Sequence, residues 1–232
     1  MAIPLFLALT SAEFAAQALP PHTGWMACHF SPYGRGLSNL PPALPAGSLL
    51  ILNDRIPMAD HDPETIARQL IRTVEAMECS GVLLDFQRGG SEEVRHLAEY
   101  LVSALPCPVA VSEAYAKDLD SPVFLAPCPH HVPLADHLLP WKGRRLWLDL
   151  AVDAQTITLT GSGSRILPFP LGEVPEGGHE DASLHCHYAI ETGPDSVRFT
   201  LWRTREDLAM LAAEAEGLGV ETLVGLYCEL GI

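Results

Sequence analysis

The sequence predicts an α/β fold, a (β/α)8 TIM-type barrel that is irregular, with some crossover helices replaced by loops or hairpins. Capped amphipathic helices alternate with short apolar strands, which is typical of a parallel sheet covered on both faces. The strand candidates number about eight or nine, and no Gly-rich phosphate loop follows the first, which favours a barrel over a doubly wound sheet. The 232 residues suffice for one such unit, so we expect a single barrel domain over residues 1–232.

The first strand is predicted at Ile3–Leu9. A secretory signal peptide is the less favoured interpretation, because no Lys or Arg precedes this apolar run. No stretch approaches the roughly 20 apolar residues that span a bilayer. The six cysteines are scattered without a CxxC pair, which is typical of reduced thiols in a core. We therefore expect a cytoplasmic protein, with secretion as the alternative.

Three capped helices, each followed by a strand, define the repeating unit. Asp62 and Pro63 suit the N-cap and the first position of one helix. Ser91 is the N-cap of the second, and Thr204 with Asp207 forms a variant of the capping box at the third. The strands predicted after these helices are Val82–Gln87, Val109–Val111 and Thr222–Tyr227.

The remaining strands are predicted between these units, and two departures from a regular barrel accompany them. The further strand candidates are Trp25–Phe30, Ser48–Leu52, Pro122–Ala126, Arg145–Leu150 and His185–Ile190. A Pro/Gly-rich loop between Tyr33 and Gly47 stands where a helix would normally lie. The segments Asp149–Ser164 and Tyr188–Trp202 have the pattern of hairpins, the second turning at residues 193–195.

The charge balance limits the partners. The chain has 29 Asp and Glu against 14 Lys and Arg, a formal net charge of -15. Such a surface repels phosphate backbones and anionic lipids, so we expect neither nucleic acid nor a membrane as partner. The sequence does not indicate an oligomeric state.

The histidines raise the question of a metal. The candidates lie close together in the sequence: His130, His131 and His137 with Asp136, and the pair His185 and His187. Two histidines that are two residues apart on a strand share one face, an arrangement found among metal ligands. Surface positions, and hydrogen bonding to sugar or water by His187, explain them better. We expect no metal and no cofactor, and keep a metal-dependent hydrolase as the least favoured function.

Polar residues recur where the predicted strands end, and barrel enzymes carry their active sites at those ends. Carboxylates gather there among aromatic residues, which is the composition of a sugar site: acceptors for hydroxyls, apolar faces for the rings and proton donors for the glycosidic oxygen. The candidates for catalysis are Asp85, Glu113 and Glu229. The candidates for binding are Gln87, His29, Tyr33, Asp54, Tyr115, Asp149, His187, Tyr188 and Tyr227.

The stretch from Ser80 to Gln87 resembles the fourth-strand signature DGxDxDxE of glycoside hydrolase family 18, the chitinase-like barrels. Gly81, Asp85 and the aromatic Phe86 agree with that pattern. The resemblance implies a barrel in which the final Glu protonates the glycosidic oxygen. It also implies that the Asp two residues before it orients the substrate's acetamido group.

The departures from this signature decide the functional hypothesis. Alternation places residues 83, 85 and 87 on the barrel-facing side, and here they are Leu83, Asp85 and Gln87. Gln87 stands at the acid position and cannot release a proton. We therefore expect a carbohydrate-binding, glycoside-hydrolase-like barrel, with an oligosaccharide or glycoside as partner, that has lost chitinase-type catalysis. The alternative is an active glycoside hydrolase with a relocated acid, Glu113 or Glu229.

Overall fold

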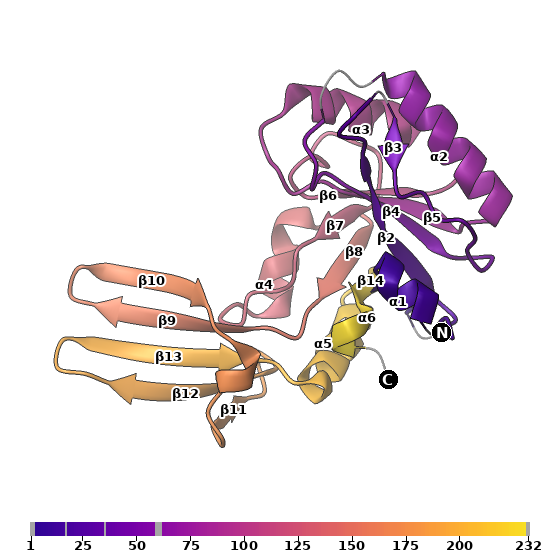
Figure 1. Ribbon diagram of the computed structural model, residues 1–232. Helices are drawn as coiled ribbons and strands as arrows, with labels where there is room; N and C mark the ends of the chain where they lie inside the picture. The colour runs from indigo at the N-terminus through magenta and orange to yellow at the C-terminus, as the bar shows by residue number, and fades with distance from the viewer. Residues whose placement is uncertain (1–2, 17, 35, 59–61, 231–232) are drawn as a thin grey trace. The chain divides into compact units, whose positions relative to one another are not determined.

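The computed structural model describes residues 3–16, 18–34, 36–58 and 62–230 (Figure 1). Its contacts divide the chain into two compact units. One unit comprises Met1–Ala126, Gly143–Asp149 and Val220–Ile232, and the other comprises Pro127–Lys142 and Leu150–Gly219. The organisation as a single domain stays a prediction.

The first unit contains a closed barrel of eight strands. In ring order these are β1 (Leu5–Leu9), β2 (Thr23–Phe30), β4 (Leu49–Asn53), β5 (Gly81–Asp85), β6 (Val109–Ser112), β7 (Val123–Leu125), β8 (Leu146–Leu150) and β14 (Val220–Leu226). β1 closes the ring because it pairs in parallel with both β2 and β14. The short β3 (Leu37–Ser38) adds an antiparallel strand at the edge of β2. The predicted barrel is confirmed.

Alternate residues of the strands fill the barrel interior, which is a packed core. Its large side chains include Leu83 of β5, Phe124 of β7 and Trp147 of β8, all almost completely buried. Glycines allow close approach between the strands. A Cβ on Gly24 would lie 3.3 Å from the Ala8 backbone, tighter than ordinary contacts. This inward alternation continues along each strand, so it decides which residues reach the mouth.

The helices of this unit begin where the sequence predicts. Asp62 caps α2 (Pro63–Met77) by accepting from the backbone N–H groups of Glu64 and Thr65. Ser91 caps α3 (Glu92–Ala104) through the N–H of Val94. Two short helices, α1 (Ser11–Ala16) and α6 (Tyr227–Leu230), follow the first and last barrel strands.

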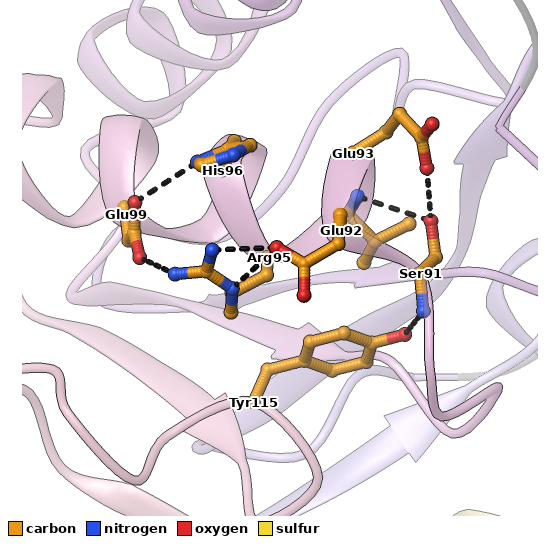
Figure 2. Close-up of polar contacts among 8 residues, drawn as sticks. Ser91, Glu92, Glu93, Arg95, His96, Glu99 and Tyr115 are labelled. Atoms are coloured by element: carbon orange, nitrogen blue, oxygen red, sulfur yellow. Dashed lines mark hydrogen bonds and ion pairs between the residues drawn. The ribbon is translucent and has the colours of Figure 1, made fainter.

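The first turns of α3 carry an exposed charge network. Figure 2 shows the Arg95 guanidinium between Glu92, at 2.6 Å, and Glu99, at 2.5 Å. Such i,i+3 and i,i+4 pairs stabilise a helix by a few tenths of a kcal/mol each. Tyr115 reaches the same helix end, where its hydroxyl accepts from the N–H of Ser91 at 3.4 Å. The loop between β5 and α3 is thus fixed at its far end.

The second unit is built on an antiparallel sheet with the order β10-β9-β13-β12-β11. Its strands are β9 (Ala154–Thr160), β10 (Gly163–Pro168), β11 (His179–Asp181), β12 (Cys186–Thr192) and β13 (Ser196–Trp202). Its helices are α4 (Leu134–Leu138), η1 (Leu139–Trp141), η2 (Leu171–Glu173) and α5 (Arg205–Gly217). Thr204 and Asp207 form the predicted capping box of α5. The hairpins β9–β10 and β12–β13, orange to yellow in Figure 1, correspond to the two that the sequence predicts, although the first runs from Ala154 to Pro168 and not from Asp149 to Ser164.

One predicted barrel strand was wrong. The segment His185–Ile190 is not part of the barrel, because Cys186–Thr192 forms β12, which pairs antiparallel with β11 and β13. A short alternating run has the same period in both kinds of sheet. The turn after Thr192 brings Ser196–Trp202 alongside, so the local hairpin forms in place of a barrel strand. His187 and Tyr188 therefore belong to the second unit.

A buried arginine organises the base of the second unit. Arg203 is 2% exposed, and its guanidinium donates to the backbone carbonyls of Cys128, Pro129, Leu184 and His185. These four carbonyls satisfy a buried charge that has no carboxylate in hydrogen-bond contact among the described residues. The guanidinium thus joins the segment before α4 to the start of β12.

Candidate functional site

An open cavity of about 860 Å³ lies at the carboxyl ends of β1, β2, β4 and β5, entirely within the barrel unit. The polar side chains at these strand ends include Thr10, His29, Asp85 and Gln87. Ile51 and Met26 supply apolar surface from the strands below. The carboxyl ends of barrel strands are where this fold carries its sites, and this cavity is therefore our candidate functional site.

A β-bulge in β2 brings His29 to this cavity. The register between β2 and β4 shifts between Trp25 and Cys28, so that one extra residue enters β2. The bulge reverses the alternation: Cys28 is fully buried, and His29 lines the cavity. Burial raises the pKa of the Cys28 thiol to about 12, so this thiol stays protonated.

Asn39 and Asn53 fix the geometry around the bulge. Asn53, at the end of β4, donates through Nδ2 to the carbonyls of Met26 and Cys28, both at 2.9 Å. Asn39 and His29 are joined at 3.0 Å through Nδ2 and Nε2, and Nδ1 of His29 lies 2.7 Å from its neighbouring carbonyl, that of Phe30. His29 is thus held by both ring nitrogens and cannot swing freely.

Asp85 and Gln87 form the polar pair at the end of β5. Nε2 of Gln87 donates to Oδ1 of Asp85 at 3.0 Å. Burial raises the pKa of the Asp85 carboxyl, an effect that the hydrogen bond from Gln87 opposes and the nearby charge of Asp54 reinforces. Asp85 continues the inward line of Leu83 in the barrel core, as predicted from alternation. Gln87 follows in the loop, since β5 ends at Asp85.

The backbone around Gln87 is held by partners on both sides. Asp54, 5% exposed, accepts from the N–H groups of Gln87 at 3.1 Å and Arg88 at 2.8 Å. From the side of β6, Ser112 donates to the carbonyl of Phe86 at 2.6 Å, and the Tyr115 hydroxyl donates to the carbonyl of Arg88. The pair Asp85–Gln87 is therefore preorganised rather than placed on a loose loop.

The structure brings four of the predicted site residues to one cavity. They are His29, Asp54, Asp85 and Gln87. Both carboxylate oxygens of Asp54 already accept hydrogen bonds from the loop backbone, so Asp54 positions Gln87 within the cavity lining.

The other predicted residues lie elsewhere. Among the described residues that line the cavity, the acidic side chains are Asp54 and Asp85. Glu113, after β6, accepts from the N–H of Ala126 at 3.4 Å, and Glu229 lies in α6. The remaining positions are Tyr115, buried against Phe86; Tyr33, 97% exposed; Asp149 and Tyr227, half-buried at the ends of β8 and β14; and His187 and Tyr188 in β12 of the second unit.

Other lining residues were missed by the sequence analysis. Thr10 and Ser11 directly follow the first strand, so the same strand-end argument would have found them. Arg55 and Arg88 stand one residue beyond Asp54 and Gln87. Asn39 gives no such signal, because only the pairing of β3 with β2 brings it near His29.

The histidines do not assemble with other ligands. Within the described ranges, no group of three or more His, Cys, Asp or Glu side chains is placed to hold a metal ion. His130 contacts Asp153 and His185 contacts Glu214, each as a pair within the second unit. None of the helices in the described part of the chain combines the length and the apolar character needed to cross a membrane.

Solved structures show what this barrel is similar to. A family 18 N-acetylglucosaminidase from Paenibacillus barengoltzii superposes with a TM-score of 0.65 and 10% identity, over 96% of this chain and 94% of that one. The barrel has the fold of family 18 glycoside hydrolases. A chitinase-like agglutinin from Robinia pseudoacacia superposes with a TM-score of 0.63 and 12% identity, over 98% of this chain and 95% of that one. A Glu-to-Gln mutant of a class V chitinase from Nicotiana tobaccum, solved in complex with NAG4, superposes with a TM-score of 0.60 and 12% identity, over 97% of this chain and 93% of that one.

The resemblance predicted from Ser80–Gln87 is thus confirmed for the fold. No family model matches the sequence, and no curated protein matches it significantly. At identities of 10–12% the likeness concerns the fold alone. Because the similar structures include enzymes and an agglutinin, the fold does not choose between catalysis and binding, and the chemistry of the cavity has to decide.

Proposed function

We propose that this protein binds an oligosaccharide in the cavity over β1, β2, β4 and β5, and that it has lost chitinase-type hydrolysis. The observation that carries the proposal is the hydrogen bond from Gln87 to Asp85, 3.0 Å long, at the rim of that cavity. An amide stands where the family 18 signature has its acid. An amide donates and accepts hydrogen bonds but has no proton to transfer to a leaving oxygen.

The absence of an acid has a large expected effect on rate. General acid catalysis contributes roughly 10²–10⁴-fold. Asp85 does not replace it, because the family resemblance gives this position the task of orienting the acetamido group. Leu83 takes the place of a further carboxylate on the same line, where it packs in the barrel core. The site therefore keeps its shape and its hydrogen-bonding groups while the proton donor is gone.

Several features support a sugar as the ligand. The carboxylate of Asp85 and the amide of Gln87 offer acceptors and a donor at one open cavity. The Thr10 hydroxyl and the His29 ring also line it, but they are already hydrogen-bonded within the protein. Met26 and Ile51 add apolar surface suited to the faces of sugar rings. A similar structure was solved in complex with NAG4, and another is an agglutinin. We take an oligosaccharide of N-acetylglucosamine as the first ligand to test.

The second candidate function is hydrolysis with a relocated acid. Glu113 follows β6 and Glu229 lies in α6 after β14, so both stand near strand ends of the same barrel. Either could act as the acid if a bound sugar extended beyond the cavity described here. Replacement by Gln removes the proton and keeps the shape. If the wild type cleaves a glycan and Glu113→Gln or Glu229→Gln abolishes the cleavage, this second function is correct.

Native mass spectrometry with chitotetraose tests the proposal, because one spectrum reports bound and cleaved species together. We expect a one-to-one complex and no shorter oligosaccharides after prolonged incubation. Asp85→Ala should weaken the complex, whereas Tyr33→Ala is the matched control, since Tyr33 is 97% exposed and outside the described cavity lining. Cleavage by the wild type would refute the loss of catalysis. Unchanged binding by Asp85→Ala would refute the assigned cavity.

A further inference from the structure

Two arginines stand at the rim of the candidate cavity, and neither is in an ion pair with a described acidic residue. Arg55 follows β4 and Arg88 follows Gln87, and both line the cavity. By contrast, Arg145 pairs with Glu221, and Arg95 pairs with Glu92 and Glu99. In a chain with 29 acidic and 14 basic residues, partners for two arginines would be easy to supply.

Backbone contacts hold the two arginines side by side. Nη2 of Arg88 donates to the carbonyl of Arg55 at 3.1 Å, and the N–H of Arg55 donates to Oδ1 of Asn53 at 3.1 Å. The N–H of Arg88 is fixed in turn by Asp54 at 2.8 Å. Both positions are thus anchored to the ends of β4 and β5, while the remaining guanidinium donors are left for a ligand.

The lining of the cavity is less acidic than the chain as a whole. The family 18 signature DGxDxDxE would place three aspartates and a glutamate along this strand and its end. Of these positions, only those of Asp85 and Gln87 line the cavity, since Ser80 precedes β5 at the other end of the strand and Leu83 is buried in the barrel core. The described lining has two arginines, Arg55 and Arg88, and two acidic residues, Asp54 and Asp85, so their formal charges balance, whereas the whole chain has a formal net charge of -15.

We propose that the cavity selects an anionic amino sugar, an N-acetylhexosamine unit that carries a carboxylate, with Arg55 and Arg88 as the residues that recognise the carboxylate. This inference rests on the proposed function and names the class of sugar. Guanidinium groups bind carboxylates through two parallel hydrogen bonds, which adds direction as well as charge. A neutral chitin fragment would use the cavity but leave both guanidinium groups without a counter-charge.

The test compares two tetrasaccharides that differ only in charge-bearing substituents. One is chitotetraose, and in the other every second unit is N-acetylmuramic acid, which is N-acetylglucosamine with a lactyl carboxylate on its 3-oxygen. Isothermal titration calorimetry should show tighter binding of the acidic tetrasaccharide by about tenfold at low ionic strength, the size of one good charge-assisted contact. The preference should shrink as salt is added.

Variants then assign the preference to residues. In the double variant Arg55→Gln with Arg88→Gln, the ratio of the two affinities should fall towards one. Arg55→Lys with Arg88→Lys should keep part of it. Arg72→Gln is the control, because Arg72 is an exposed arginine of α2 outside the described lining, and it should keep the full ratio.

The outcomes separate this inference from the proposed function. Equal binding of both tetrasaccharides by the wild type would overturn the anionic preference and leave glycan binding intact. A preference that survives in the Arg55→Gln and Arg88→Gln double variant would overturn the assignment to these arginines. Absence of binding to either tetrasaccharide would refute the proposed function together with this inference. The salt dependence is measured on the wild type alone, so this part of the test does not depend on whether a variant folds.

Discussion

Oδ2 of Asp54 accepts a hydrogen bond from the backbone N–H of Arg88 at 2.8 Å, across the gap between the ends of β4 and β5. Its other oxygen accepts from the N–H of Gln87 at 3.1 Å. A carboxylate that is 5% exposed thus serves as the anchor of the loop that carries Gln87. The backbone position of Gln87 is therefore fixed by a residue that directly follows the neighbouring strand β4.

Replacing Asp54 should loosen this loop and destabilise the barrel unit. Asp54→Ala leaves two amides without their acceptor, at a cost of about 1–3 kcal/mol for each if they stay buried. Asp54→Asn keeps one acceptor oxygen and should cost less. Urea unfolding measures the loss, and hydrogen exchange should become faster at the amides of Gln87 and Arg88 in particular. If these two amides exchange in Asp54→Ala at the same rate as in the wild type, Asp54 does not anchor the loop.

Asp85 should make the stability of the protein depend on pH in a defined direction. Burial raises its pKa in the folded state above the ordinary value of 3.8. Between the two values the folded chain holds a proton that the unfolded chain has lost, so the free energy of unfolding decreases as pH rises through this window. Wild-type protein should therefore lose stability relative to Asp85→Asn as the pH rises above 3.8. Denaturant unfolding at several pH values measures the difference, and Asp118→Asn, at an exposed position, is the control.

His130, in the second unit, should make the stability of the protein depend on pH in the opposite direction. Burial, reinforced by the charge of Arg203, lowers the pKa of His130 from 6.5 to about 4. Between these values the unfolded chain binds a proton that the folded chain does not, so the free energy of unfolding decreases as the pH falls. The shift corresponds to roughly 3 kcal/mol. His130→Gln should lose less stability than the wild type on acidification from pH 7 to 4, as measured by urea unfolding. His179→Gln, at an exposed position of the second unit, is the control, and an equal acid response in the wild type and His130→Gln would contradict the prediction.

The sequence was sufficient to predict the barrel and part of the candidate site. Caps at Asp62 and Ser91 mark helix starts by local chemistry, and alternation correctly places Asp85 in line with Leu83. These features depend on residues close in the chain, so a pattern reveals them. The same reasoning failed for His185–Ile190, since an alternating run of six residues does not tell which strand will pair with it.

The parts of the site that escaped prediction depend on contacts distant in sequence. Asp54 holds the loop at Gln87, 33 residues away, and Tyr115 holds Arg88 from 27 residues away. The bulge that brings His29 to the cavity is stabilised by Asn53, 25 residues from the carbonyl of Cys28. No local pattern encodes such pairings. Strand-end position identified Tyr115 and Asp54 as polar residues near the mouth but could not show that their polar atoms bind the backbone.

Restoring the acid is the strongest test of the proposed loss of catalysis. In Gln87→Glu, a carboxyl group would replace an amide whose nitrogen lies 3.0 Å from Oδ1 of Asp85. Two carboxyl groups at hydrogen-bond distance share a proton, which raises the pKa of one of them and makes it available to a leaving oxygen near neutral pH. We expect Gln87→Glu to cleave chitotetraose, with mass spectrometry detecting the shorter products. The gain should lie towards the lower end of the 10²–10⁴-fold range of general acid catalysis, because Leu83 leaves the supporting carboxylate of this line absent.

The controls for this variant follow from its geometry. Asp85→Asn in the Gln87→Glu background removes the carboxylate that would share the proton, and that the family resemblance also expects to orient the acetamido group, so cleavage should disappear. Gln87→Asp shortens the side chain by one carbon and should restore less activity, because the acid no longer reaches the same point. If the double variant cleaves as fast as Gln87→Glu alone, the restored acid works without Asp85 and the proposed pair is wrong. If Gln87→Glu binds chitotetraose but leaves it intact, the missing proton is not what separates this barrel from an active hydrolase.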